Sequence, residues 1–167
     1  MPPYVAEMPL AGFKTAELFL LTTLRLWLAA QRRAPVPDWR RGLAAAGLAE
    51  DGAPDFDMTM RILVAGGRRL DSRPAGHPRL SADEARLLRL FGALQRGETG
   101  EAVGILQAWL PSRPLRWLMH YAHSFVGVMA AQRLILPAEW LWSYRISRYA
   151  RVLAGFWAAV PSYCTSA

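Results

Sequence analysis

Proline and glycine divide this sequence into seven pieces of helical length. Within these pieces the apolar residues recur every three or four positions, which is the period of an amphipathic α-helix. None of the gaps contains an alternating apolar–polar run with turn signals, the usual pattern of a half-buried strand. The sequence therefore predicts an all-α protein, folded as a single irregular helical bundle of about six or seven helices.

The predicted helices leave only short connections, apart from the stretch between the third and the fourth. The clearest local signal is Ser81-Ala82-Asp83-Glu84, a capping box in which Ser81 and Glu84 satisfy each other's backbone N–H groups. Asp38 is the expected N-cap of the second helix, and residues 50–55 are expected to form a loop. The predicted ranges are about 14–33, 39–46, 56–65, 81–97, 100–110, 112–134 and 137–159.

The most apolar window, residues 16–30, belongs to the first predicted helix. It is too short for an ordinary membrane span and contains Glu17 and Arg25, so we predict a deeply buried core helix and no integral membrane span. On a helical wheel, four residues are expected to form its polar face: Lys14, Thr22, Arg25 and Arg32.

A chain of 167 residues fits one domain, because a single core of that size buries roughly 70% of the surface of the unfolded chain. We expect 1–167 to form a single helical domain with flexible ends at 1–12 and 161–167. Cys164 is the only cysteine, so no intrachain disulfide can form. The single cysteine favours a reducing compartment, and no export signal is evident at the N-terminus, so a cytoplasmic location is expected.

The formal net charge is +7, but nineteen of the twenty basic residues are arginines and the chain has no asparagine, a composition typical of a GC-rich genome. The charge is concentrated in residues 58–80 and 113–167. The first block contains a long basic connection, 66–80, which is expected either to bind a partner or, as the favoured alternative, to be a disordered surface connector. Its candidate residues are Arg68, Arg69, Arg73 and Arg79.

Two histidines of the sixth predicted helix, His120 and His123, are three positions apart and could share a metal ion. A site with two protein ligands is incomplete, so we favour a structural interpretation. In this view both histidines belong to a polar strip with Arg116, Ser124 and Gly127, opposite an apolar face for packing. That face consists of Leu115, Leu118, Met119, Ala122, Phe125, Val126 and Met129.

The seventh predicted helix combines an apolar seam with an outer arginine face. Six large residues recur at alternating spacings of four and three: Trp142, Ile146, Tyr149, Leu153, Phe156 and Val160. Arginines interleaved with aromatic residues could contact a protein partner or phosphates, or could form a solvated face. The partner-binding candidates are Trp140, Tyr144, Arg145, Arg148 and Arg151.

The sequence contains no P-loop, dinucleotide fingerprint, nucleophile elbow or HExxH motif. We therefore predict a non-enzymatic helical interaction or regulatory protein without a cofactor, which binds a protein partner or associates with itself as a homodimer. A nucleic-acid-binding regulator that uses the arginine-rich surfaces is the first alternative. The second is a small helical metal or cofactor binder, or an enzyme, around His120 and His123.

Overall fold

The computed structural model describes residues 4–66, 69–110 and 112–137. Within these ranges the only extended pairing is an isolated β-bridge between Pro9 and Arg79. The all-α prediction is therefore confirmed. The described part of the chain contains six helices: α1 (Thr15–Gln31), α2 (Arg40–Ala45), α3 (Gly52–Ala65), α4 (Ala82–Gln95), α5 (Thr99–Gln107) and α6 (Ser112–Ala131).

All the described residues except Pro137 belong to one compact unit that extends to Leu136. The seventh predicted helix, 137–159, lies outside the described residues apart from Pro137, and the expectation of one domain over 1–167 stays a prediction. None of the helices in the described ranges is both long enough and apolar enough to cross a membrane.

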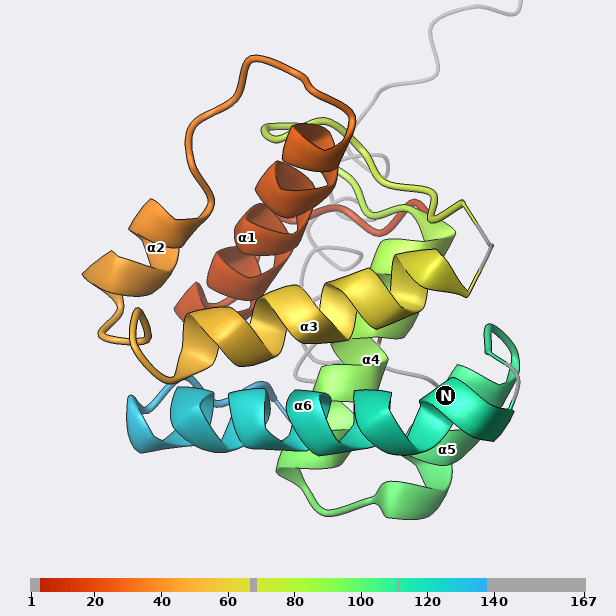
Figure 1. Ribbon diagram of the computed structural model, residues 1–167. Coiled ribbons are helices and arrows are strands. Elements are labelled where there is room, and N and C mark those ends of the chain that lie inside the picture. Colours follow the sequence, from red (N-terminus) through yellow and green to blue (C-terminus); the bar gives the residue numbers. More distant parts are fainter. Residues whose placement is uncertain (1–3, 67–68, 111, 138–167) are drawn as a thin grey trace, which may run out of the picture. The chain divides into compact units, whose positions relative to one another are not determined.

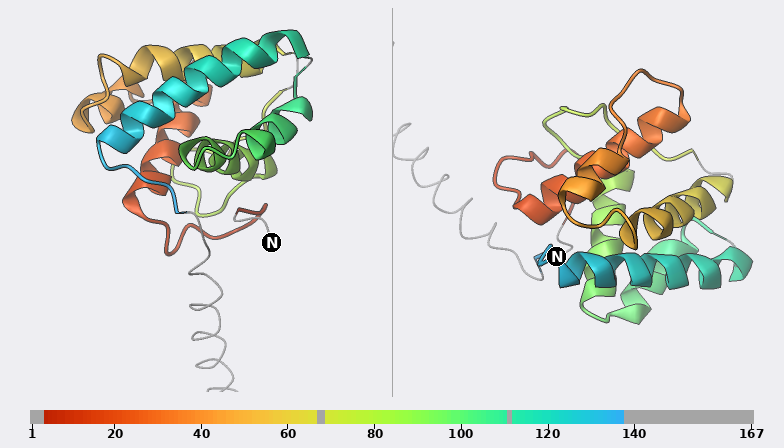
Figure 2. Two further views of the ribbon diagram at one scale, coloured as in Figure 1. Left: turned by 90° about the horizontal axis from the view of Figure 1, so that it is seen from below. Right: turned by 60° about the vertical axis from the view of Figure 1, so that its left-hand side comes forward.

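Helices α3 and α6 run antiparallel and side by side, and α4 crosses behind them (Figure 1). The pair α1 and α2 lies on the other side of α3 from α6. Seen from below, α3 and α6 form one side of the unit, and α4 and α5 form the other (Figure 2). Each of α3 and α6 therefore has one face toward the core and one face toward solvent.

Four aromatic rings form a continuous contact through the core. Trp39 packs against Phe56 with ring centroids 5.6 Å apart, Phe56 against Phe125 at 5.1 Å, and Phe125 against Phe91 at 5.7 Å. These rings come from the start of α2, from α3, from α6 and from α4. The core is thus assembled from helices that are distant in the sequence, and each tilted ring contact adds to the free energy of burial.

Two helices end at glycine as predicted. Gly47 follows α2 with a φ of 74°, and Gly97 follows α4 with a φ of 73°. Beyond α4, the Gly97 N–H bonds to the Leu94 carbonyl and the Glu98 N–H to the Ala93 carbonyl, which is the Schellman pattern. Glycine suits this position because its missing Cβ permits a left-handed backbone.

Two other helices end in the same way without a glycine. Arg33 after α1 and Arg133 after α6 have φ values of 56° and 59°. In each case the N–H of the arginine and the N–H of the residue after it donate to carbonyls of the last helical turn, with N···O distances between 2.9 and 3.1 Å. Helices α1 and α6 therefore stop at Gln31 and Ala131, before the predicted ends at Arg33 and Leu134.

Two predicted ranges need larger corrections. Helix α3 begins at Gly52, so the loop predicted at 50–55 is mostly helical. Pro54 lies in its first turn, where the fixed φ of proline suits a helix and its missing N–H costs nothing. Helix α5 ends at Gln107 rather than at Leu110, and a turn in which Trp109 N–H bonds to Leu106 carbonyl follows it.

Helix α1 is the buried core helix that the sequence predicts, with Leu20, Leu24 and Trp27 almost fully enclosed. The expected polar face was wrong for Arg25, which is only 3% exposed. A lone guanidinium is rarely buried unless it is paired. The partner of Arg25 is Glu84 in the first turn of α4, just after the end of the basic connection.

Candidate interaction surface

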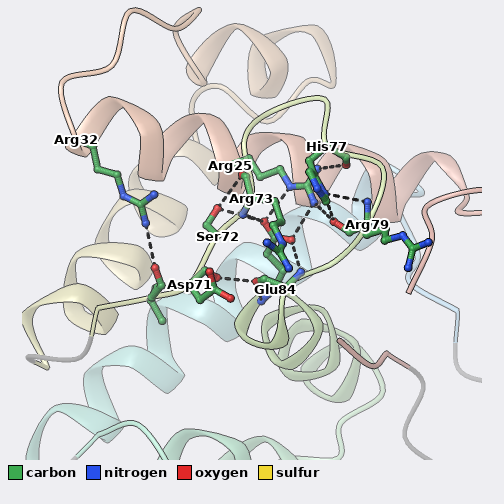
Figure 3. A network of polar contacts seen from close by, with 10 residues as sticks. Arg25, Arg32, Asp71, Ser72, Arg73, His77, Arg79 and Glu84 are labelled. Carbon is green, nitrogen blue, oxygen red and sulfur yellow. Dashed lines mark hydrogen bonds and ion pairs between the residues drawn. The ribbon is translucent and has the colours of Figure 1, made fainter. Parts of the chain in front are cut away.

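The basic connection between α3 and α4 is built around a buried ion pair. Arg25 donates from Nε and Nη2 to the two carboxylate oxygens of Glu84, at 2.9 Å each. The same guanidinium donates to the carbonyls of His77 and Arg79, at 2.7 Å each (Figure 3). One arginine of α1 thus fixes both the first turn of α4 and the connection that precedes it.

Glu84 completes this arrangement from the side of α4. Its carboxylate accepts the N–H groups of Ser81 and Arg73 at 2.9 Å each, and the hydroxyl of Ser72 at 3.2 Å. Ser81 accepts the Glu84 N–H at 3.1 Å, so the predicted capping box is confirmed. The same Ser81 hydroxyl donates to the Asp71 carbonyl at 2.7 Å. Within the predicted connector 66–80, these bonds contradict disorder for residues 71–80.

The N-terminal segment pairs with the end of this connection. The Glu7 N–H donates to the Leu80 carbonyl and the Leu80 N–H to the Met8 carbonyl, both at 2.9 Å. Tyr4 and Met8 are buried. Burial raises the pKa of the Tyr4 phenol, and the neighbouring Glu17 carboxylate raises it further. Residues 4–10, part of the expected flexible end, thus contribute to the core.

The three candidate arginines of the connection that the structure describes, Arg69, Arg73 and Arg79, do not form one free basic site. Arg73 pairs with Glu7, and its own N–H is held by Glu84. Arg69 and Arg79 are exposed and make no ion pair with the described part of the chain, although the Arg79 carbonyl is bound by Arg25. Arg68 lies outside the described residues. Among the described arginines of this segment, only the Arg73 guanidinium is therefore paired within the fold.

His120 and His123 are both exposed on α6. His120 stacks edge-on against Tyr121, with ring centroids 5.2 Å apart. Within the described ranges no group of three or more histidine, cysteine, aspartate or glutamate side chains is arranged to hold a metal ion. The residues of the polar strip, Arg116, His120, His123, Ser124 and Gly127, are exposed as predicted. In the opposite apolar face Leu118, Ala122, Phe125, Val126 and Met129 are buried, whereas Leu115 and Met119 are half-buried.

The candidates from the seventh predicted helix cannot be placed. Five residues lie outside the described part of the chain: Trp140, Tyr144, Arg145, Arg148 and Arg151. Their proposed role in partner binding stays a prediction.

The solvent-facing side of α3 and α6 carries an apolar groove that the sequence interpretation missed. Met58 and Ile62 of α3 line it from one side, and Pro114, Trp117 and Tyr121 of α6 from the other. Its volume is about 380 Å³. The Trp117 side chain is 53% exposed and the Met58 side chain 39% exposed. We call these five residues the α3/α6 groove.

One charged side chain lies beside a residue of the groove lining, and an ion pair lies on α3 outside that lining. Arg116 lies over the Trp117 ring, with Cζ 5.0 Å from its centroid. Arg61 pairs with Asp57 at 2.7 Å across one turn of α3, and the other oxygen of Asp57 accepts the Trp27 indole N–H at 2.7 Å. The Asp57 charge is therefore already engaged, whereas Arg116 makes no ion pair with any described residue.

A second surface hollow, of about 390 Å³, lies between α4 and α5. Its charged residues are already paired, because Arg86 contacts Asp83 at 3.0 Å and Arg89 contacts Glu101 at 3.3 Å. A ligand would have to compete with these ion pairs. The α3/α6 groove, whose lining has no internal partner to displace, is the stronger candidate.

The signal for the groove was present in the sequence. Met58 and Ile62 are four positions apart, as are Trp117 and Tyr121, so each pair lies on one side of its helix. Only the antiparallel packing of α3 on α6 brings the two pairs together. No protein-family model, curated protein or solved structure matches this chain.

Proposed function

We propose that this protein is a non-enzymatic interaction module that binds a partner protein in the α3/α6 groove. The observation that carries the proposal is the exposure of Trp117 and Met58 beside Ile62 and Tyr121. Contiguous apolar surface is costly to keep in water, and soluble proteins seldom expose it without a use. Tryptophan, tyrosine and methionine are enriched at protein interfaces, where tryptophan is often a hot spot.

The chemistry of the groove supports binding rather than catalysis. Its five lining residues include no carboxylate, imidazole, thiol or amine. The Tyr121 phenol and the Trp117 indole N–H are the polar side-chain groups among them. General acid–base or nucleophilic catalysis commonly pairs a group at the reacting atom with a second group that activates or orients it. The groove lining places no carboxylate, imidazole, thiol or amine beside the phenol. An aromatic and aliphatic surface with two polar groups suits recognition of another largely apolar surface instead.

The described arginines in and around the basic connection favour this proposal over nucleic-acid binding by that segment. A phosphate backbone is bound by cations that are free to contact it. Arg25 of α1, which holds the basic connection, is buried against Glu84, and Arg73 pairs with Glu7. Among the described arginines of the connection, Arg69 and Arg79 are the exposed cations. A location in the cytoplasm, expected from the single cysteine, belongs to the same proposal.

The test compares three forms of the full chain in chemical cross-linking and affinity capture: the parent, the double variant Trp117→Gln with Met58→Gln, and Ile135→Gln. Ile135 is the matched control because it is 55% exposed and lies outside the groove lining. We expect a partner bound by the parent and by Ile135→Gln to be lost by the groove variant. Equal capture by all three forms would refute the proposal.

Self-association is tested with the same three proteins. If the partner is a second copy of the chain, sedimentation velocity will show a dimer for the parent and for Ile135→Gln and a monomer for the groove variant. A dimer that persists in the groove variant would place any homodimer contact elsewhere on the molecule. Circular dichroism must show unchanged helical content in each variant, so that lost binding cannot be attributed to unfolding.

A further inference from the structure

The shape of the α3/α6 groove restricts what can occupy it. Met58 and Ile62 form a short ridge along α3, and Trp117 and Tyr121 form a second ridge along α6. Because α3 and α6 lie side by side with their axes nearly aligned (Figure 1), the two ridges lie alongside each other. A third helix can lay its own side chains into such a groove, as helices do in bundles.

The backbone of the groove walls distinguishes a helical occupant from an extended one. Both walls are helical, so their interior N–H and carbonyl groups are already bonded within α3 and α6. An extended peptide would find no sheet edge to pair with, and its own amides would lose water without gaining partners. A helix carries its backbone hydrogen bonds with it and presents only side chains.

The charge at the border restricts the occupant further. Arg116 is exposed beside Trp117 and makes no ion pair with a described residue. An acidic side chain on the occupant could reach this cation. The segment 138–167 of the chain itself carries three arginines and one glutamate. Its charge therefore does not complement the Arg116 side of the groove.

We propose that the α3/α6 groove binds a single amphipathic helix of a partner protein, with acidic residues beside its apolar face. Apolar side chains at helical spacing enter between the two ridges, and a carboxylate of the partner faces Arg116. This inference rests on the proposed function, because it names the class of partner for the same groove.

The test is a selection from a random peptide library of about 16 residues, long enough for about four helical turns. The full chain is the target, and the Trp117→Gln variant removes peptides that bind elsewhere. We expect selected peptides to carry apolar anchors at i, i+3 or i+4, and i+7, with acidic residues beside them. They should become helical on binding, and Trp117→Gln should weaken them at least about tenfold. Ile135→Gln should bind them like the parent.

A second selection on Arg116→Glu tests the charge. The preference for acidic flanks should turn into a preference for basic flanks, while the apolar spacing stays the same. If Trp117→Gln fails to fold, Met58→Gln takes its place in the counter-selection.

The outcomes separate the two proposals. Failure to obtain any peptide that depends on Trp117 or Met58 would overturn both. Groove-dependent peptides that bind in an extended form would overturn the inference and leave the proposed function standing. Helical peptides with no acidic preference, or with the same preference on Arg116→Glu, would likewise reject the partner class proposed here.

Discussion

The guanidinium of Arg25 holds both carboxylate oxygens of Glu84 at 2.9 Å, and neither side chain is more than 3% exposed. This pair joins α1 to α4 across 59 positions of the sequence. It also fixes two carbonyls of the connection between α3 and α4. The basic connection is therefore held in place by a buried arginine that is not part of it.

Removing Arg25 should be strongly destabilising. In Arg25→Met the Glu84 carboxylate stays buried without its cation, and two carbonyls lose their donors. We expect the free energy of unfolding in urea to fall by about 3–5 kcal/mol. Arg61→Met is the control, because the Arg61 side chain is 57% exposed, and it should cost less than about 1 kcal/mol. Similar losses in the two variants would contradict the structural role of the buried pair.

Ser81→Ala tests the start of α4. The substitution removes the acceptor for the Glu84 N–H and the donor to the Asp71 carbonyl. We expect a loss of about 1–2 kcal/mol in equilibrium unfolding. Thr99→Ala is a suitable control, since Thr99 is exposed at the start of α5, where no side-chain capping bond is made. An equal loss of unfolding free energy in both variants would show that the capping box adds nothing to stability.

Tyr4 should make the stability fall at alkaline pH. Burial, together with Glu17, raises its pKa in the folded state above the usual value of 10.0, so folding favours the neutral phenol. The contribution of Tyr4 to stability is fully present below about pH 10. It is lost as the pH rises further, because the phenol ionises at a lower pH in the unfolded chain than in the folded protein. Tyr4→Phe should flatten the pH dependence of the melting temperature between about pH 9 and 11. An unchanged profile would mean that the phenol reaches water.

Phe91 should be a major contributor to stability. Its ring is fully buried and contacts Phe125 at 5.7 Å. Phe91→Ala should lower the free energy of unfolding by about 3–5 kcal/mol, and Leu88→Ala by about 2–5 kcal/mol. Phe19, which is only partly buried on α1, provides the comparison and should tolerate alanine better. A change below about half a kcal/mol at Leu88 and Phe91 would rule out the core position of that face.

The elements with a strong local signal were predictable from sequence. Ser81, Gly47 and Gly97 act through the backbone of their own turn, so their effects do not depend on distant contacts. Arg33 and Arg133 adopt the left-handed conformation that usually calls for glycine, and nothing in their sequence neighbourhood marks them. The ends of α1 and α6 were therefore placed two or three residues too late.

The functional surface was harder to predict because it depends on tertiary contacts. Arg25 was expected on a polar face because helical periodicity could not reveal its partner. That partner, Glu84, lies 59 positions away in the sequence. Met58 and Trp117 each resemble an ordinary core residue within their own helix. Their exposure becomes apparent only when α3 packs on α6 and leaves that side of both helices uncovered.

The most direct test of the central claim is the affinity of the Trp117→Gln variant for a partner of the parent protein, measured together with its unfolding free energy. About half of the indole already faces water, so the stability should fall by less than about 2 kcal/mol. The affinity should fall at least about tenfold, as expected for an interface hot spot. An unchanged affinity in a folded variant would contradict the assignment of the α3/α6 groove as the interaction site.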